Sequence, residues 1–212
     1  MGRLVPGIVL AAGRSRRMGR TKALLPIGAG GETFVSRIIR TLREGGVDDV
    51  VVVVAGEESP VARALRREEL PHRVAVNPSP DQGQLSSVKA GLRAIDRPAV
   101  GGMLVTLVDV PLVSADTVRA LLAAHESTRA PVVRPVRDGR HGHPVVFDRS
   151  VFDDLRRTAV SAKEVVKAHV RDSIDVPIAE DGPFRDIDTP ADYKEVFGQP
   201  PPDVADAAGA GR

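Results

Sequence analysis

Runs of apolar residues alternate with amphipathic segments through the first two thirds of the chain. Short apolar runs predict four strands, at 4–10, 50–55, 74–77 and 103–108, and the β-branched run at 50–55 is typical of a strand buried on both faces. Apolar positions at helical spacing predict three helices, over 34–42, 86–95 and 114–125. This alternation is typical of a single three-layer α/β domain, with helices on both faces of a mainly parallel sheet.

The pattern changes after residue 130. Two short β runs, at 131–136 and 144–147, flank a polar loop and predict a β-hairpin or an addition at the sheet edge. Ser161 and Glu164 have the spacing of a capping box ahead of a short helix. A last helix is predicted over 190–197, because a proline stands at its first position.

The composition is that of one globular domain, and it argues against some classes of function. The 212 residues are 42% hydrophobic but include only one Tyr, five Phe and no Trp, so the core must consist of Val, Leu, Ile and Ala. Aromatic stacking platforms for nucleic acid are therefore not expected. We expect the domain to span 1–198, followed by a disordered tail over 199–212 that is rich in Pro, Ala, Gly and Asp.

Other absences exclude further classes of protein. Zero cysteines exclude disulfides and thiolate metal sites, so a metal here must be held by oxygen or imidazole. The formal charge of +2 is nearly balanced. No run reaches the roughly 18 apolar residues that a spanning helix needs, and the first residues lack a signal-peptide layout. We therefore expect a cytoplasmic protein without membrane association.

The stretch 10–22 carries the most specific signal. It reads Leu-Ala-Ala-Gly-Arg-Ser-Arg-Arg-Met-Gly-Arg-Thr-Lys and directly follows the first predicted strand, where parallel sheets place their ligands. Gly13 and Gly19 allow the backbone to approach a polyanion, and the basic side chains can pair with phosphate. The stretch has neither the Rossmann dinucleotide fingerprint nor the P-loop motif. The alternative interpretation is a solvated basic surface loop.

Acidic residues stand at two further positions of interest. Asp109 follows a strongly apolar strand, where an ionised carboxylate costs energy unless it is paired, solvated or bound to a metal. Asp186 and Asp188 follow a short β-like run and point the same way in an extended chain. Mg²⁺ prefers such carboxylate oxygens. The alternatives are a turn aspartate before Pro111 and ordinary capping of the last helix by Asp188.

A polar stretch around Gly83, Ser86 and Ser87 leads into a predicted helix. Free N–H groups at a helix start suit an anion or a hydroxyl group. The alternative is an N-capped surface helix. His141 and His143 flank one glycine, but a zinc pair is disfavoured because no third imidazole lies near them in the sequence. The remaining polar candidates are interpreted as solvated surface residues, namely His125, His169, Arg14, Arg16 and Arg20.

The stretch Leu-Ala-Ala-Gly-x-Ser-x-Arg-Met-Gly followed by Lys resembles the signature of the MobA-like family of molybdenum-cofactor nucleotidyltransferases, and the acidic elements follow in the family's order. The resemblance covers nearly all of 4–197 and implies a Rossmann-like nucleotidyltransferase fold. It implies nucleotide contacts at Leu10, Ala11, Ala12, Gly13, Ser15, Lys22, Gly83, Ser86 and Ser87. It implies catalytic roles for Arg17, Lys22 and Asp109. It also implies a Mg²⁺ site with ligands from Asp109, Asp188 and Asp186, with Asp188 favoured over Asp186, and an acceptor-side position for His143.

Within that family, Ala-Ala-Gly with a serine two residues later resembles the cytidylyl branch, because the guanylyl branch usually carries Gly-Gly. The resemblance thus implies transfer of CMP from CTP to the molybdenum cofactor (molybdopterin), with release of pyrophosphate and with a molybdoenzyme or its chaperone as a partner. Three alternatives stay open: another nucleotide or phosphate acceptor on the same fold, a nicotine-blue-type reductase, and a non-catalytic carrier of the cofactor.

Overall fold

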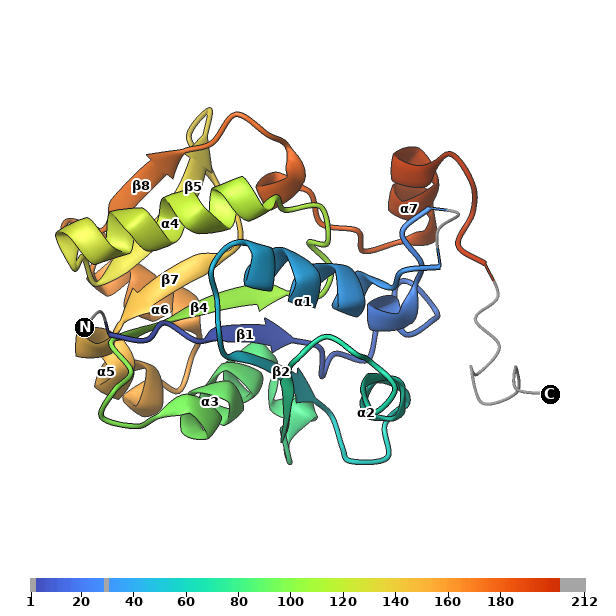
Figure 1. Cartoon of the computed structure of the whole chain (residues 1–212), viewed down its shortest axis with the longest axis horizontal. Coiled ribbons are helices and arrows are strands. Elements are labelled where there is room, and N and C mark those ends of the chain that lie inside the picture. Colours follow the sequence, from blue (N-terminus) through green and yellow to red (C-terminus); the bar gives the residue numbers. More distant parts are fainter. Residues whose placement is uncertain (1–2, 29–30, 203–212) are drawn as a thin grey trace.

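The chain folds into a central sheet between two helix layers (Figure 1). The computed structural model describes residues 3–28 and 31–202, and within these residues the sheet has eight strands. They are β1 (Gly7–Leu10), β2 (Val50–Val54), β3 (Arg73–Val76), β4 (Gly102–Leu107), β5 (Val132–Arg137), β6 (Arg140–His141), β7 (Val145–Asp148) and β8 (Ile174–Pro177). The strand order is β3-β2-β1-β4-β7-β5-β6, with β8 beside β5. β1 to β4 are parallel, which confirms the predicted fold class.

Helices cover both faces of the sheet because alternate residues of the buried strands point in opposite directions. Val9 and Val52 pack toward α1 (Phe34–Glu44), α2 (Pro60–Leu65) and α4 (Ala115–Thr128). Ile8 and Val51 pack toward α3 (Gln84–Ile95), α5 (Phe152–Arg157) and α6 (Ala162–Ala168). Aliphatic side chains therefore supply both core layers, as the composition predicts.

The last helix, α7 (Pro190–Phe197), packs against the chain that follows β1 rather than against the sheet (Figure 1). Tyr193 is fully buried there, and its ring lies 6.2 Å from that of Phe34. Its hydroxyl group donates a hydrogen bond of 2.9 Å to the carbonyl oxygen of Pro26. This contact joins segments 167 residues apart and fixes the chain just before α7 next to the first loop.

Two strand predictions differ from the structure. β5 and β7 are antiparallel neighbours, as the hairpin prediction requires, but β7 lies inside the sheet between β4 and β5. It belongs there because Val145, Val146 and Phe147 are apolar and buried. The tight turn instead joins β5 to the two-residue strand β6 at the edge. β8 was not predicted, since its alternating, partly exposed residues give a weak signal.

Helix ends and one histidine also correct the sequence predictions. α3 begins at Gln84 rather than at residue 86, with Gly83 as its N-cap at φ 84°. The predicted capping box at Ser161 does not form; the observed box joins Thr189 and Asp192. His125, predicted to be a surface residue, is 1% exposed, and its Nε2 lies 2.9 Å from a carboxylate oxygen of Asp148. His125 lies on the face of α4 that packs against β7, and the local sequence does not indicate this packing.

The end of the chain is described only in part. α7 ends at Phe197, next to the predicted domain boundary at 198. The predicted disordered tail begins at 199. Pro201 nevertheless contacts the domain, because Arg20 donates a hydrogen bond of 2.7 Å to its carbonyl oxygen. The rest of that prediction, 203–212, lies outside the described residues. Among the described residues, no helix is long and apolar enough to cross a membrane.

Candidate active site

The loop after β1 forms a compact turn at the carboxyl edge of the sheet. Ser15 adopts a left-handed conformation, with φ 49°, and its carbonyl oxygen accepts hydrogen bonds from the N–H groups of Met18 and Gly19. Its hydroxyl oxygen accepts a hydrogen bond of 3.1 Å from the N–H of Lys22. No described residue accepts a hydrogen bond from the backbone N–H groups of 13–17. These free donors suit an anion such as a phosphate chain.

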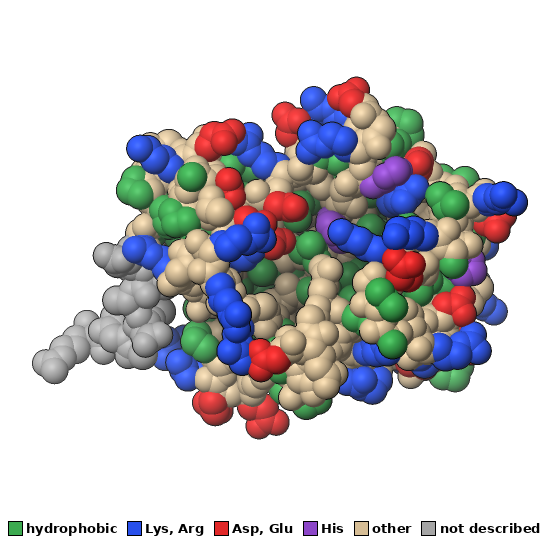
Figure 2. All heavy atoms as spheres, turned by 180° about the vertical axis from the view of Figure 1, so that it is seen from behind, with side chains coloured by type: hydrophobic (Ala, Val, Ile, Leu, Met, Phe, Trp, Pro, Cys, Tyr) green, Lys and Arg blue, Asp and Glu red, His purple; other side chains and the backbone are tan. Residues whose placement is uncertain are grey.

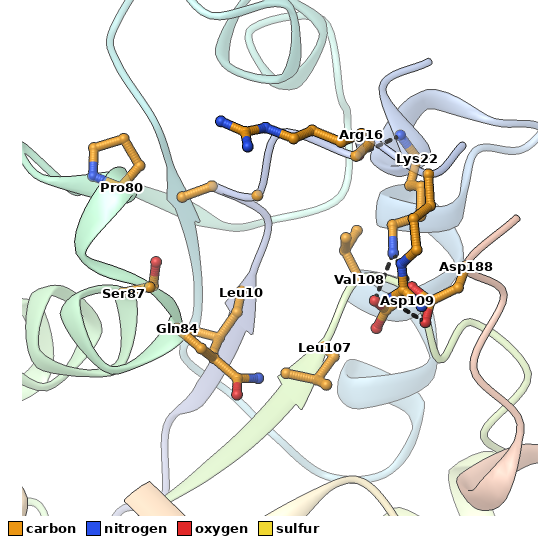
Figure 3. Close-up of a pocket in the computed structure, with 15 residues that line it drawn as sticks. Leu10, Arg16, Lys22, Pro80, Gln84, Ser87, Leu107, Val108, Asp109 and Asp188 are labelled. Carbon is orange, nitrogen blue, oxygen red and sulfur yellow. Dashed lines mark hydrogen bonds and ion pairs between the residues drawn. The ribbon is translucent and has the colours of Figure 1, made fainter. Parts of the chain in front are cut away.

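An ion-pair cluster lies beside this loop (Figure 3). The ammonium nitrogen of Lys22 lies 2.7 Å from Oδ2 of Asp109 and 2.7 Å from Oδ1 of Asp188. Arg17 reaches the other oxygen of Asp188 at 2.6 Å while its own side chain is 70% exposed. Residues from three separate parts of the chain thus meet at the end of β4, as the resemblance implies.

Burial and neighbouring charges shift the pKa of Lys22 in opposite directions. Burial alone would lower the pKa of its ammonium group, but the hydrogen bonds and negative charges of Asp109 and Asp188 outweigh burial and raise this pKa above its ordinary value. A raised pKa in the folded state means that the ammonium stabilises the fold fully at neutral pH. This stabilisation is lost only as the pH rises through the folded-state pKa, above 10.5.

The two aspartates near α7 occupy different positions. Segment 185–189 is irregular, so the predicted β-like run before Pro190 is wrong. Fully buried Ile187 donates its N–H to the carbonyl oxygen of Asp109 at 2.8 Å, which places Asp188 in the cluster. Asp186 is exposed as a residue, yet desolvation of its carboxyl group and the negative charges of Asp109 and Asp188 raise its pKa. The geometry favours Asp188 over Asp186 as the site carboxylate.

A cavity of about 330 Å³ opens between the first loop and α3. This volume is at the small end of the range for ligand pockets, about 300–1,000 Å³. Figure 2 shows the molecule hollowed on one face, with acidic and basic side chains close together beside the hollow. The lining includes Leu10, Ala12, Gly13, Ser15, Arg16, Arg17, Lys22, Pro80, Gly83, Gln84, Ser87, Leu107, Val108, Asp109 and Asp188.

The wall opposite the first loop depends on Asn77, which is 1% exposed at the end of β3. Its amide nitrogen donates hydrogen bonds to the hydroxyl oxygens of Ser86 at 2.8 Å and Ser87 at 3.0 Å. Its side-chain oxygen accepts a bond of 2.9 Å from the N–H of Ser79. Ser87 and Gly83 line the cavity as expected, whereas Ser86 points its hydroxyl group into the loop, where it bonds to carbonyl oxygens of the loop itself.

His143 lies two residues before β7, and the residues that line the cavity do not include it. Its backbone N–H donates to the carbonyl oxygen of Pro183 at 2.9 Å, and its Nδ1 is buried without a partner among the described residues. Burial lowers the pKa of its ring, although the charge of Asp109 acts in the opposite direction. His141 instead pairs with Asp175 at 2.9 Å, so the two histidines do not converge on a common site.

A family model described as the MobA-like NTP transferase domain matches residues 7–174. The match covers the first loop, Asp109 and every lining residue of the cavity except Asp188. The chain belongs to the MobA-like NTP transferase family.

Curated relatives and solved structures are similar to this chain over at least two thirds of its length. A "Probable molybdenum cofactor guanylyltransferase" of Mycobacterium tuberculosis is 30% identical over 188 residues, covering 87% of this chain and 89% of the relative. A "Nicotine blue oxidoreductase" of Paenarthrobacter nicotinovorans is 37% identical over 150 residues, covering 68% and 71%. The crystal structure of Rv0371c from Mycobacterium tuberculosis superposes with a TM-score of 0.76 at 25% identity, covering 94% of this chain and all of that one. A second structure of that protein is a complex with manganese.

The names of these relatives bear on the nucleotide. The Mycobacterium relative is named for guanylyl transfer, whereas the sequence of this family member predicts cytidylyl transfer. The choice of nucleotide therefore stays a prediction.

Several residues around the site of this MobA-like domain were not found from its sequence. The sequence places Asn77 only at the end of a predicted strand, although a polar residue at the carboxyl end of a parallel strand is a usable signal of a ligand site. Arg14 and Arg16 are both exposed, as predicted, but Arg16 also lines the cavity and Arg14 pairs with Asp81 at 2.6 Å. The partner of Arg14 is 67 residues away and gives no local signal.

Replacing Asn77 by alanine is expected to loosen the wall of the cavity. The variant loses both donors to the serines and leaves their hydroxyl groups with fewer partners, so the free energy of unfolding is expected to fall by about 2 kcal/mol. The KM for the nucleotide is expected to rise about tenfold with a smaller change in kcat, because the wall binds rather than reacts. Urea unfolding and steady-state kinetics measure both effects. Gln82→Ala, an exposed change in the same loop, is the control, and equal effects of the two variants would contradict this role.

Proposed function

We propose that this family member transfers a nucleotidyl group from CTP to the terminal phosphate of a molybdopterin-type acceptor and releases pyrophosphate. The observation that carries the proposal is the cluster in which Lys22 bridges Asp109 and Asp188 beside a turn of free N–H donors. Cations and amide donors suit a triphosphate, while carboxylates suit the divalent cation that accompanies it. A module that only carried the cofactor would not need all of these charges together.

The carboxylates fit a divalent cation, which we propose to be Mg²⁺. Oδ1 of Asp109 is buried without a partner among the described residues, so one carboxylate oxygen is available as a ligand. Asp188 presents a second carboxylate to the same point. When bound, Mg²⁺ supplies Lewis-acid stabilisation of charge on the phosphate oxygens. The described residues contain no group of three His, Cys, Asp or Glu side chains able to hold a metal, so water and phosphate oxygens would complete the ligand set.

The protein's residues would then act mainly by position and charge. The N–H groups of 13–17 hold the triphosphate, and the ammonium of Lys22 and the guanidinium of Arg17 neutralise charge as pyrophosphate leaves. The acceptor phosphate attacks the α-phosphorus in line, the bond to the pyrophosphate oxygen breaks, and pyrophosphate departs with that electron pair. No general base is needed, because a phosphate nucleophile is already an anion. His143, whose ring is buried, is assigned to the acceptor side because the family resemblance implies that position.

The choice of CTP is supported by Ala12. It lies two residues after β1 and lines the cavity at the position where the guanylyl branch usually carries a glycine. The cytidylyl branch that this motif resembles uses CTP. GTP is a second candidate, because the Mycobacterium relative is named as a guanylyltransferase.

Pyrophosphate release from CTP, GTP, ATP and UTP, each with Mg²⁺ and with or without the molybdenum cofactor, tests the choice of nucleotide. We expect release with CTP and cofactor together, at least tenfold faster than with any other nucleotide. A preference for GTP would overturn the assignment of CTP and leave nucleotidyl transfer standing. Transfer of the product to a molybdoenzyme or its chaperone is part of the same proposal.

A further inference from the structure

The ammonium group of Lys22 lies where a cation would bind both carboxylates. We propose that Lys22 is an exchangeable counter-ion, which joins Asp109 to Asp188 in the free protein and leaves them for the triphosphate when nucleotide and divalent metal bind together. This inference rests on the proposed nucleotidyl transfer, because the triphosphate is the second partner of the ammonium. It makes metal binding depend on the nucleotide.

The four ion-paired groups of the free site are already balanced in charge. Asp109 and Asp188 carry two negative charges, and Lys22 and Arg17 carry two positive ones, all joined by contacts of 2.6–2.7 Å. A divalent cation added to this set meets a buried ammonium at close range, since Lys22 is only 9% exposed. Both oxygens of Asp188 are already held, one by Lys22 and one by Arg17, so a metal that binds both carboxylates must displace a cation and break a charge-assisted hydrogen bond. The ammonium of Lys22 joins the two carboxylates and therefore lies where the metal would bind. The free protein should therefore bind metal weakly.

The surrounding residues offer the metal little compensation. In the described part of the chain, no third His, Cys, Asp or Glu side chain joins the two carboxylates. Mg²⁺ and Mn²⁺ prefer oxygen ligands, and Mg²⁺ sites commonly take one or two carboxylates and complete the set with substrate phosphates. A triphosphate thus supplies both the missing metal ligands and a new anionic partner for the displaced ammonium.

Two features allow the exchange without moving the backbone. The N–H of Lys22 is held by the hydroxyl oxygen of Ser15, so the side chain starts from a fixed point in the loop that faces the triphosphate. Its four-carbon stem can rotate toward either side. Oδ1 of Asp109 is buried and unpartnered among the described residues, while Lys22 uses only Oδ2, so this carboxylate has one oxygen ready for a second cation.

Binding of Mn²⁺ alone, followed by electron paramagnetic resonance on the full chain without nucleotide, tests the competition. Lys22→Met keeps most of the stem and removes the charge, so it is expected to tighten Mn²⁺ binding at least tenfold over wild type. In the double variant Lys22→Met/Asp109→Asn, this gain in Mn²⁺ affinity is expected to disappear. Lys22→Gln is a second variant with the same expected result, should Lys22→Met fail to fold by circular dichroism.

Arg16→Met is the matched control. Arg16 is a cation that lines the same cavity but extends away from the carboxylates (Figure 3). If the direct contact of Lys22 with the carboxylates weakens Mn²⁺ binding, rather than the overall positive charge of the cavity, loss of Arg16 should tighten Mn²⁺ binding less than threefold. An unchanged or weaker Mn²⁺ affinity of the folded Lys22 variants, or an equal gain in Arg16→Met, would overturn the exchange.

A second measurement, of Mn²⁺ binding in the presence of a nucleotide, distinguishes a failure of this inference from a failure of the proposed function. A non-hydrolysable CTP analogue is expected to increase protein-bound Mn²⁺ at least tenfold in wild type and to add much less in Lys22→Met. If Lys22→Met gains affinity but no nucleoside triphosphate raises Mn²⁺ binding in wild type, the transfer of the ammonium to a triphosphate and the proposed function are both overturned. If wild type releases pyrophosphate normally while Lys22→Met gains no affinity, only the exchange is overturned.

Discussion

Replacing Asp109 by alanine is expected to lower divalent-metal-dependent turnover by at least about a thousandfold, the scale of losing a major electrostatic contact in the transition state. Its carboxylate offers the one buried, unpartnered oxygen at the site among the described residues, and it lies 2.7 Å from Lys22. The change removes a side chain that follows the core strand β4 rather than packing within it, so unfolding should stay cooperative. Pyrophosphate release and a urea unfolding curve measure the two quantities.

Neighbouring carboxylates supply controls for this prediction. Asp188→Asn should impair turnover strongly, whereas Asp186→Asn should cost less than tenfold, because Asp186 has no hydrogen-bond partner within the described residues and lies outside the cluster. An active Asp109→Ala enzyme would remove this residue from the metal site. Equal losses of turnover in Asp188→Asn and Asp186→Asn would contradict the assignment of Asp188, rather than Asp186, as the metal ligand.

Replacing Lys22 by alanine is expected to raise the activation barrier by about 2 kcal/mol or more, the scale of one strong charge contact. The effect should fall on kcat as well as on kcat/KM, since the ammonium is needed most when charge moves onto the leaving pyrophosphate. Steady-state kinetics with saturating acceptor measure it. Arg16→Ala, which removes another cation of the cavity, should change kcat by less than threefold, and a Lys22→Ala enzyme with wild-type turnover would contradict the role of this residue.

Local sequence was sufficient for the elements buried on both sides. The valines at 50–54 form β2 because a run of β-branched residues suits a strand covered by helices on both faces. α7 begins and ends where predicted, with Pro190 in its first turn. The loop at 10–22 was recognised because its glycines and cations follow a parallel strand.

Features that depend on distant contacts could not be predicted. Segment 185–189 reaches the site because Ile187 and Tyr193 are buried against residues more than 150 positions earlier, and no periodicity encodes that packing. His125 was misjudged because its partner Asp148 lies on β7, which joins the sheet interior rather than its edge. Asn77 holds two serines only after β3 and α3 come together.

The central claim is most directly tested by mass spectrometry of the acceptor after incubation with CTP, Mg²⁺ and the full chain. Nucleotidyl transfer predicts that the acceptor gains the mass of one CMP unit less one water, with one pyrophosphate formed per product. An acceptor that stays unchanged with every nucleoside triphosphate would contradict the account. A heterocyclic substrate that is instead reduced, by a hydride from an added reductant and a proton from water, would favour an activity like that for which the Paenarthrobacter relative is named.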